Sequence, residues 1–305
     1  MRKAGILLGI ALVVLVSVAL IIVALAPGSF GSLISGLGPE QRQDVNKTFE
    51  VNGKGQIVIE NDNGKIDVNG VPGTTVVTIN AVKIVNGTDA TAIDRLTFTA
   101  EQQGDNIIIK AGKAQGFENW FIGNARVEIS VSLPQTMAAN LTSSNGAITL
   151  RNFNNSEATN YLKTSNGTIR IEQVKAKVLE LHSSNGAQTI NNSTASLKAS
   201  TSNGRIEANN SNLNLERVST SNGQVDINGT LVQTSAGMIE TSNGSIQLNL
   251  DKTNAVIFDA TTGNGNIDFQ LSGVNFEIKD KRHVLTTADG PTLRISAGNG
   301  SVTIK

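Results

Sequence analysis

The side chains that could carry chemistry in this sequence are scattered carboxylates, guanidinium groups and amides. Five charged candidates occur at one or two per repeat: Arg170, Glu172, Arg205, Glu207 and Asp226. Some β-helical enzymes cleave polysaccharides with such groups gathered on one strand face, which keeps a carbohydrate-active β-helix enzyme open as an alternative. An even distribution along the repeats is more typical of a solvated strand face. We therefore predict that the protein is not an enzyme.

Metal binding and nucleophilic catalysis have little support in the sequence. Cysteine is absent, and His182 and His283 are far apart and begin no metal-binding pattern. The segment Asn61-Asp62-Asn63-Gly64 matches only the start of a calcium loop. Phosphate loops, dinucleotide fingerprints and nucleophile elbows do not occur in their required context. We predict no cofactor, no metal site and no catalytic residue.

The charge balance limits the classes of partner. The 305 residues contain 25 Lys and Arg and 25 Asp and Glu, so no net field draws the chain toward nucleic acid. Charged residues make up only 16% of the chain, and Gly, Asn, Ser and Thr are abundant instead. That composition favours strands and turns over helices. We predict no nucleic-acid partner.

The most informative pattern is a Ser-Asn-Gly unit that recurs along the chain. Looser copies of the unit centre on Asn63, Asn264 and Asn299. The steps between successive Asn residues from Asn145 to Asn264 are 21, 19, 18, 19, 21 and 21 residues. A period near 20 residues indicates a repeat architecture. The close copies centre on Asn145, Asn166, Asn185, Asn203, Asn222 and Asn243.

Alternation around each Asn indicates strands with one buried face. Counting the Asn as position 0, positions −4, +3 and +5 are apolar in nearly every copy, and position −2 is small. Gln188, at position +3, is the clear departure. A meander of hairpins could use Asn-Gly turns, but it needs neither equal steps nor matching positions. We predict an all-β parallel β-solenoid with coils of about 20 residues.

Each Asn-Gly pair then forms a corner of a coil. The Asn shares its parity with the apolar residues, so we expect its amide to point inward and to bond the amides of neighbouring coils. We expect the Gly to supply a positive φ. The predicted structural corner residues are Asn145, Gly146, Asn166, Gly167, Asn185, Gly186, Asn203, Gly204, Asn222, Gly223, Asn243, Gly244, Asn264, Gly265, Asn299 and Gly300.

The amino terminus predicts a membrane anchor. Arg2 and Lys3 precede 22 uncharged residues, from Gly5 to Ala26, and a helix of that length rises roughly 33 Å. A cleaved signal peptide is the alternative, although Pro27 would directly follow the cleavage site. The preceding cations place the amino terminus in the cytoplasm and the rest of the chain outside. We predict a single-pass plasma-membrane protein that contacts the membrane through residues 5–26.

Four segments follow from these patterns. Residues 1–26 are the anchor or signal peptide, and residues 27–44 are a Gly/Ser/Pro-rich spacer. Residues 45–136 are an amino-terminal β region that caps the solenoid, and residues 137–305 are the repeats. The charged run at residues 276–282 is expected in the terminal coils or a cap, where charge discourages end-to-end association. Among the Asn-x-Ser/Thr sequons, the candidate N-glycosylation acceptors are Asn46, Asn86 and Asn192.

The repeats resemble a known family. Residues 126–150 (RVEISVSLPQTMAANLTSSNGAITL), residues 51–68 and the later Ser-Asn-Gly units are similar to the DUF4097 family of β-strand repeat proteins, a group named as candidate adhesins. Its members show a strand ending in Leu-Pro, followed by Thr-Ser-Asn-Gly-x-Ile-x-Val units. The resemblance covers residues 49–305. It implies an all-β repeat fold and an adhesin-like role, and it supplies no catalytic residues.

The expected function is therefore non-enzymatic. We expect an adhesin-like, interaction or envelope structural module, with surface glycans or envelope proteins as candidate partners. A solenoid suits such a role because it presents a long, rigid surface of regularly spaced polar side chains. A self-assembling surface scaffold is a further alternative.

Overall fold

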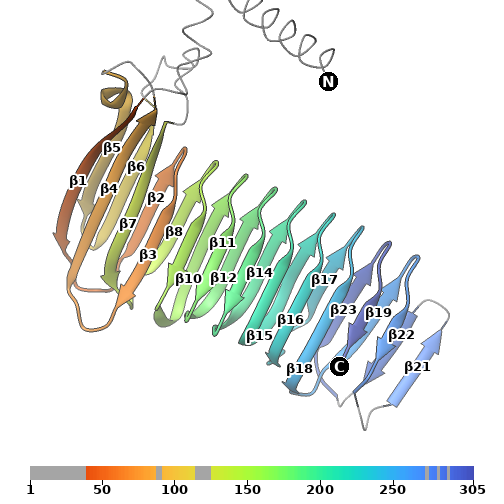
Figure 1. The fold of residues 1–305 in the computed structure, drawn as a ribbon. Helices are drawn as coiled ribbons and strands as arrows, with labels where there is room; N and C mark the ends of the chain where they lie inside the picture. Colours follow the sequence, from red (N-terminus) through yellow and green to blue (C-terminus); the bar gives the residue numbers. More distant parts are fainter. Residues whose placement is uncertain (1–38, 87–90, 114–124, 272–274, 280–281, 287–288) are drawn as a thin grey trace, which may run out of the picture.

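The computed structural model describes residues 39–86, 91–113, 125–271, 275–279, 282–286 and 289–305 (Figure 1). Within these residues the chain forms 24 strands and one short 3₁₀ helix, η1 (Ala92–Arg95). The prediction of an all-β, solenoid-like fold is confirmed. The strands belong to one hydrogen-bonded network, and they lie side by side along the long axis of the molecule.

The central strands form the regular part of the stack. Each coil has one strand that leads into a Ser-Asn-Gly corner and one that leaves it, and like strands of neighbouring coils pair in parallel. These strands are β8 (Ala138–Ser143), β9 (Ile148–Arg151), β10 (Asn154–Thr164), β11 (Ile169–Glu172), β12 (Lys175–Ser183), β13 (Gln188–Asn191), β14 (Thr194–Thr201), β15 (Ile206–Thr220), β16 (Val225–Leu231), β17 (Gly237–Thr241) and β18 (Ile246–Thr253).

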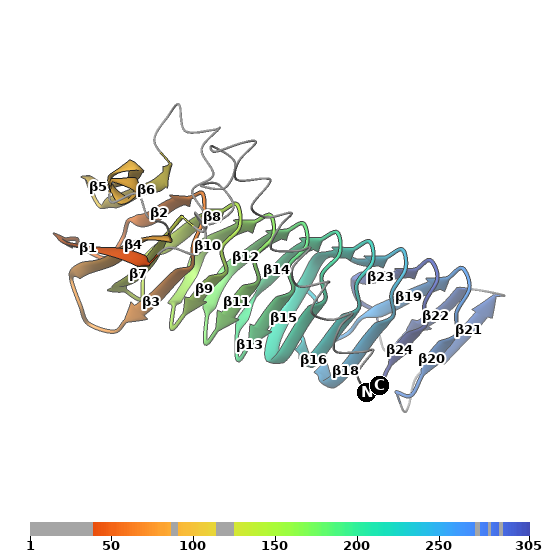
Figure 2. The same ribbon diagram turned by 45° about the horizontal axis from the view of Figure 1, so that its top comes forward.

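The stack therefore has two main faces, which Figure 2 shows from a second direction. Sheet A contains the strands that precede the corners, such as β8, β10, β12, β14 and β17. Sheet B contains the strands that follow them, such as β9, β11, β13, β16 and β18. The long strand β15 serves both: residues 206–209 pair with β13, and residues 212–220 pair with β14.

Period-2 alternation builds the core between the two sheets. Ile148 and Leu150 are fully buried, whereas Thr149 between them is half-buried. Parallel pairing in register places Ile148 beside Ile169, so the apolar residues of position +3 form a continuous column through the stack. Each such side chain stabilises the fold by about 1.5–3 kcal/mol when it is fully buried.

Gln188 interrupts that column. It lies between Ile169 and Ile206 and is fully buried. Its Nε2 donates to the backbone oxygen of Ser200 at 2.6 Å, while no described residue bonds its Oε1. The departure seen in the sequence is thus a buried polar side chain with only part of its hydrogen-bonding capacity satisfied.

The amino-terminal strands are not in sequence order within the stack. They are β1 (Glu40–Glu50), β2 (Gln56–Asn61), β3 (Ile66–Val71), β4 (Val76–Asn86), β5 (Leu96–Gln103), β6 (Asn106–Lys113) and β7 (Arg126–Pro134). The coil of β2 and β3 lies between the coil of β6 and β7 and that of β8 and β9. The stack therefore continues across the division that we predicted at residue 137.

Antiparallel strands close this end. On the sheet A side β5 pairs with β6, and on the sheet B side β4 pairs with β7 and β1 with β4. The middle of the stack is therefore a parallel solenoid, as predicted, and the whole sheet is mixed because antiparallel strands lie at this end. The last residues of the predicted spacer, from Glu40 onward, already belong to β1.

The carboxyl-terminal strands also depart from sequence order. They are β19 (Ile257–Thr262), β20 (Ile267–Phe269), β21 (Asn275–Lys279), β22 (Arg282–Thr286), β23 (Thr292–Ala297) and β24 (Val302–Ile304). The final coil, β23 and β24, is inserted between the coil of β17 and β18 and that of β19 and β20. Beyond it, β22 pairs antiparallel with β19, and β21 pairs with β22. The described part of the charged run, residues 276–279 in β21 and Arg282 in β22, thus lies at the end of the stack, as predicted.

The predicted membrane helix lies outside the described residues, which begin at residue 39. Among the residues that the structure does describe, no helix has the length and apolar character needed to cross a bilayer.

Candidate functional site

Stacked asparagines line the corner of every regular coil. The Nδ2 of each Asn donates to the Oδ1 of the Asn in the coil before it, at 2.7–2.8 Å. The order in the ladder is Asn145, Asn166, Asn185, Asn203, Asn222, Asn243, Asn299 and Asn264. Asn299 precedes Asn264 because the final coil is inserted. The expected amide ladder is present.

The direction of these amides differs from our expectation. We predicted that they point inward, yet every Asn of the ladder is exposed. The parity rule requires a continuous extended strand, and the backbone bends at the residue that precedes each Asn. The buried series therefore ends at position −2, and the amides run along the outer edge of the stack.

The Ser or Thr at position −2 forms a second, inner ladder. In most coils its hydroxyl accepts a hydrogen bond from the backbone N–H of the corner Gly in the same coil, as Thr220 does from Gly223 at 3.1 Å. The same hydroxyl donates to the corner Gly oxygen of the preceding coil, as Thr220 does to Gly204 at 3.0 Å. This hydroxyl therefore makes one hydrogen bond within its own corner and one to the corner of the preceding coil.

The corner glycines are required for a different reason from the one we predicted. The φ angles of the predicted corner glycines lie outside the left-handed region, whereas Gly64, at the looser copy centred on Asn63, has a φ of 117°. A Cβ built on Gly204 would lie 2.0 Å from the backbone oxygen of Gly186, and the other regular corners are equally tight. Glycine is needed because successive corners approach closely. Left-handed residues other than glycine lie instead at the opposite corner of four successive coils: Asn152, Gln173, Asn192 and Asn210.

A second amide ladder runs along the outside of sheet B. Asn209 donates to Asn191 at 3.2 Å, Asn228 donates to Asn209 at 2.9 Å, and Asn249 donates to Asn228. Sequence reasoning missed this ladder. Its signal was present, because Asn occupies position +6 in four successive coils.

The charged enzyme candidates form local pairs on sheet B. Arg205 bonds Asp226 at 2.7 Å and lies 3.7 Å from Glu207, and Arg170 lies 3.6 Å from Glu172 in another coil. Each carboxylate faces a guanidinium group, so these residues do not form the pair of opposed carboxylates that glycoside hydrolysis commonly requires. Within the described ranges, no three His, Cys, Asp or Glu side chains gather as metal ligands would.

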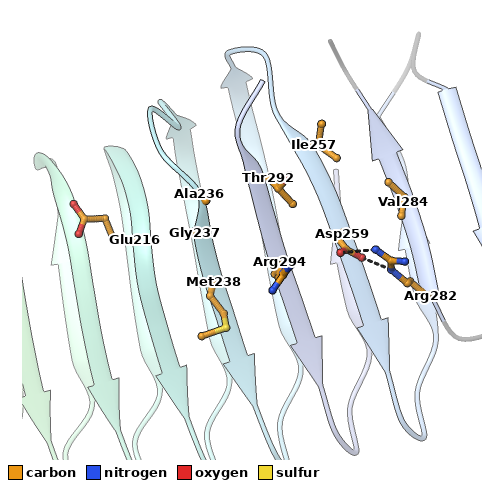
Figure 3. A pocket seen from close by; sticks show the side chains of 10 residues that line it. All are labelled: Glu216, Ala236, Gly237, Met238, Ile257, Asp259, Arg282, Val284, Thr292 and Arg294. Atoms are coloured by element: carbon orange, nitrogen blue, oxygen red, sulfur yellow. Dashed lines mark hydrogen bonds and ion pairs between the residues drawn. The ribbon is translucent and has the colours of Figure 1, made fainter. Parts of the chain in front are cut away.

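A hollow opens on the outer face of sheet A where β15, β17, β23, β19 and β22 lie side by side (Figure 3). Its volume is about 630 Å³. Ala236, Gly237, Ile257, Thr292 and Val284 line it together with the charged residues discussed below. A second hollow of about 390 Å³ adjoins it at Glu216 and Ala236 and extends toward β12. We call the two together the sheet A groove.

An ion pair stands at one end of the groove. Arg282 donates from Nε and Nη2 to the two carboxylate oxygens of Asp259, at 2.7 and 2.8 Å (Figure 3). The hydrogen bond from Arg282 lowers the pKa of Asp259, burial opposes this, and the charges of Arg282 and Arg294 add to the lowering. The pair therefore contributes stability above the unfolded-state pKa, and that contribution is lost as pH falls through the lower folded-state pKa.

Two arginines in the groove have no such partner. Arg217 and Arg294 occupy position −5 of their coils, on either side of Met238. Both are exposed, and no carboxylate of the described residues forms an ion pair with either. Other basic side chains of the groove have partners: Lys198 lies 3.4 Å from Glu216, and the His182 ring bonds Glu180 at 2.9 Å. Sequence reasoning did not select these arginines, because inserting the last coil brings Arg294 to this place.

The sequons have diverse settings. Asn46 is exposed in the middle of β1, Asn86 ends β4 and is half-buried, and Asn192 is exposed at a left-handed corner. Of the three, only Asn192 lies outside the strands. Their glycosylation remains a prediction.

The fold and the groove together define an all-β repeat protein with a long polar surface. The profile of the family described as Toastrack DUF4097 matches residues 80–305. The chain belongs to this family. No curated protein matches it.

Solved structures also match the chain, at low sequence identity and with low TM-scores. A candidate adhesin from Bacteroides fragilis is 15% identical, with 86% of this chain and 97% of that chain covered and a TM-score of 0.43. A candidate lipid-binding protein from Parabacteroides distasonis is 12% identical, with 88% and 98% covered and a TM-score of 0.43. A candidate cell adhesion protein from Clostridium sporogenes is 13% identical, with 87% and 99% covered and a TM-score of 0.25.

Proposed function

We propose that the protein is a non-enzymatic, adhesin-like interaction module whose sheet A groove binds an acidic surface glycan. One observation carries the proposal: two exposed arginines, which form no ion pair with any described carboxylate, flank Met238 across a groove that crosses several coils. Neighbouring strands are about 4.8 Å apart, so the two arginines stand about 10 Å apart along the groove.

The chemistry of arginine supports an anionic ligand. Its planar fork matches carboxylate and sulfate groups with two hydrogen bonds, and the charge persists at every physiological pH. Met238, Ile257 and Val284 supply an apolar surface beside the guanidinium groups, on which the ring of a sugar can pack. The stacked ladders hold these groups at a constant spacing, which suits a polymer with repeated acidic groups.

The proposed setting is the outer face of the plasma membrane. Residues 5–26 would anchor the chain, with the amino terminus in the cytoplasm and the β domain outside. There the groove would meet surface glycans, or envelope proteins that carry them. The two alternatives, a carbohydrate-active enzyme and a self-assembling scaffold, have less support, because the charged candidates are locally paired and antiparallel strands close both ends.

The binding prediction is tested with a glycan array and the full chain in nanodiscs. We expect binding to acidic glycans that weakens with added salt, and no comparable binding to their neutral counterparts. Replacing both Arg217 and Arg294 by Gln removes charge-assisted hydrogen bonds, so the affinity should fall at least about tenfold. Arg170→Gln, an exposed arginine on sheet B, is the matched control and should leave the affinity unchanged. Equal binding of neutral glycans would refute the proposal.

The topology prediction is tested by adding protease to intact cells. We expect digestion of the β domain from outside, with a membrane-bound amino-terminal fragment left behind. Full protection of the domain would contradict the proposed orientation, and release of the intact domain without a membrane fragment would indicate a cleaved signal peptide.

A further inference from the structure

We propose that Asn299-Gly300 is a site of spontaneous covalent modification, at which the asparagine converts to aspartate and isoaspartate. The reaction begins when the backbone nitrogen of the Gly loses its proton and attacks the side-chain carbonyl carbon of the Asn. A nitrogen–carbon bond forms, the carboxamide carbon–nitrogen bond breaks, and ammonia leaves. Water then opens the resulting cyclic imide at either carbonyl. Asn-Gly pairs favour the attack because Gly has no side chain to obstruct it.

Most corners of the stack oppose the first step. The Gly N–H donates to the hydroxyl at position −2, so removing its proton also breaks a hydrogen bond. The distances are 2.9 Å for Gly146 to Ser143, 3.1 Å for Gly167 to Thr164, 2.8 Å for Gly186 to Ser183, 3.1 Å for Gly204 to Thr201, 3.1 Å for Gly223 to Thr220 and 3.0 Å for Gly265 to Thr262. These Asn-Gly pairs lie in one exposed row, yet the hydrogen bond of each Gly N–H slows their conversion.

Two corners of the ladder lack this protection within the described residues. At Asn243 the hydroxyl of Thr241 is present, but it donates to the Gly223 oxygen and does not receive the Gly244 N–H. At Asn299 the hydroxyl itself is missing. Position −2 of its coil is Ala297, which has no hydroxyl. Among the residues that the structure describes, no acceptor receives the Gly300 N–H. Asn299 itself is exposed to water.

Asn222 is a matched comparison within the same molecule. Both asparagines donate to one ladder neighbour and accept from another, at 2.7–2.8 Å. Both are exposed, and both are followed by a Gly whose φ lies outside the left-handed region. They differ in the hydroxyl that receives the Gly N–H. A difference in conversion rate between them therefore reports on that hydroxyl.

The position of the site gives the modification a structural effect. Asn299 belongs to the inserted coil and bonds Asn243 on one side and Asn264 on the other. Conversion removes the Nδ2 donor that reaches Asn243, and isoaspartate adds a methylene group to the backbone of the corner. The inserted coil would then loosen from the coil before it.

The test follows conversion in the purified full chain, held in mildly alkaline buffer and mapped by peptide mass spectrometry. We expect Asn299 to convert about fivefold faster than Asn222, the ratio expected from one net hydrogen bond. Ala297→Ser should slow conversion at Asn299, and Thr220→Ala should accelerate it at Asn222. Ser occupies this position in other coils, so the first variant should fold.

Equal rates at Asn299 and Asn222 would overturn the proposal, and so would an unchanged rate in Ala297→Ser. Amide exchange of β23, measured on the same samples, should rise with the converted fraction. In Thr220→Ala, the conversion rate should rise at Asn222 alone. If it rises equally at every other corner, the cause is general unfolding, and the role assigned to the hydroxyl is contradicted.

Discussion

Replacing Gly204 by alanine is expected to destabilise the domain by about 3 kcal/mol, at the upper end of what overpacking usually costs. The new Cβ would lie 2.0 Å from the oxygen and 2.6 Å from the carbon of Gly186, and both atoms are backbone. A backbone carbonyl cannot rotate away as a side chain can, so the two coils must separate. Chemical denaturation monitored by circular dichroism measures the change.

Ser202→Ala provides the control at the same corner. Ser202 is exposed, so its replacement should change the stability by less than about 0.5 kcal/mol. If Gly204→Ala is as stable as this control, then the close approach of successive corners does not explain the glycines. An unchanged amide-exchange rate in β14 of the Gly204→Ala protein would lead to the same conclusion.

Deleting residues 289–305 is expected to unfold the carboxyl-terminal end of the stack. Without β23 and β24, the coil of β19 and β20 loses its contact with the coil of β17 and β18. Leu293, Ile295 and Val302, which are fully buried, leave the core. Limited proteolysis should therefore cut within residues 254–286, and amide exchange there should become fast, while β8 to β14 remain protected.

Two point variants test whether the effect of the deletion comes from the loss of buried side chains or from the shortening of the chain. Ile295 lies between Ile239 and Ala260 and is fully buried, so Ile295→Asp should reproduce the effect of the deletion. Its neighbour Ser296 faces solvent, so Ser296→Asp should have little effect. Continued protection of β19 in the deletion protein would mean that β19 can pair directly with β17, and that the inserted coil is dispensable.

The repeat and its core were predictable because both follow from local rules. Alternation places Ile148 and Leu150 on one face of a strand whatever its neighbours are, and a near-constant period makes stacked coils the economical arrangement. The ladder of corner asparagines was predictable for the same reason. The polar outward positions also followed, although the ladder at Asn209 was not predicted.

Two expectations at the corner were wrong because they depended on the path of the backbone between strands. Parity does not survive a bend, so Asn203 points along the outside although it shares its parity with buried residues. The φ of Gly204 could not be inferred from its type, because glycine serves both for positive φ and for close approach. The hydrogen bonds of the hydroxyl at Thr201 likewise become evident only once the coils are stacked.

By itself, the sequence determined the fold class, the period, the apolar columns and the existence of the amide ladder, because these depend on residues close together in the chain. The tertiary structure alone decided the order of the coils at both ends. No local signal places β2 and β3 between later strands, or inserts β23 between β17 and β19. That insertion brings Arg294 to the groove and Asn299 into the ladder. A strand that is distant in sequence can pair only where a strand edge of the stack is still unpaired. A single sequence does not specify which edge that is.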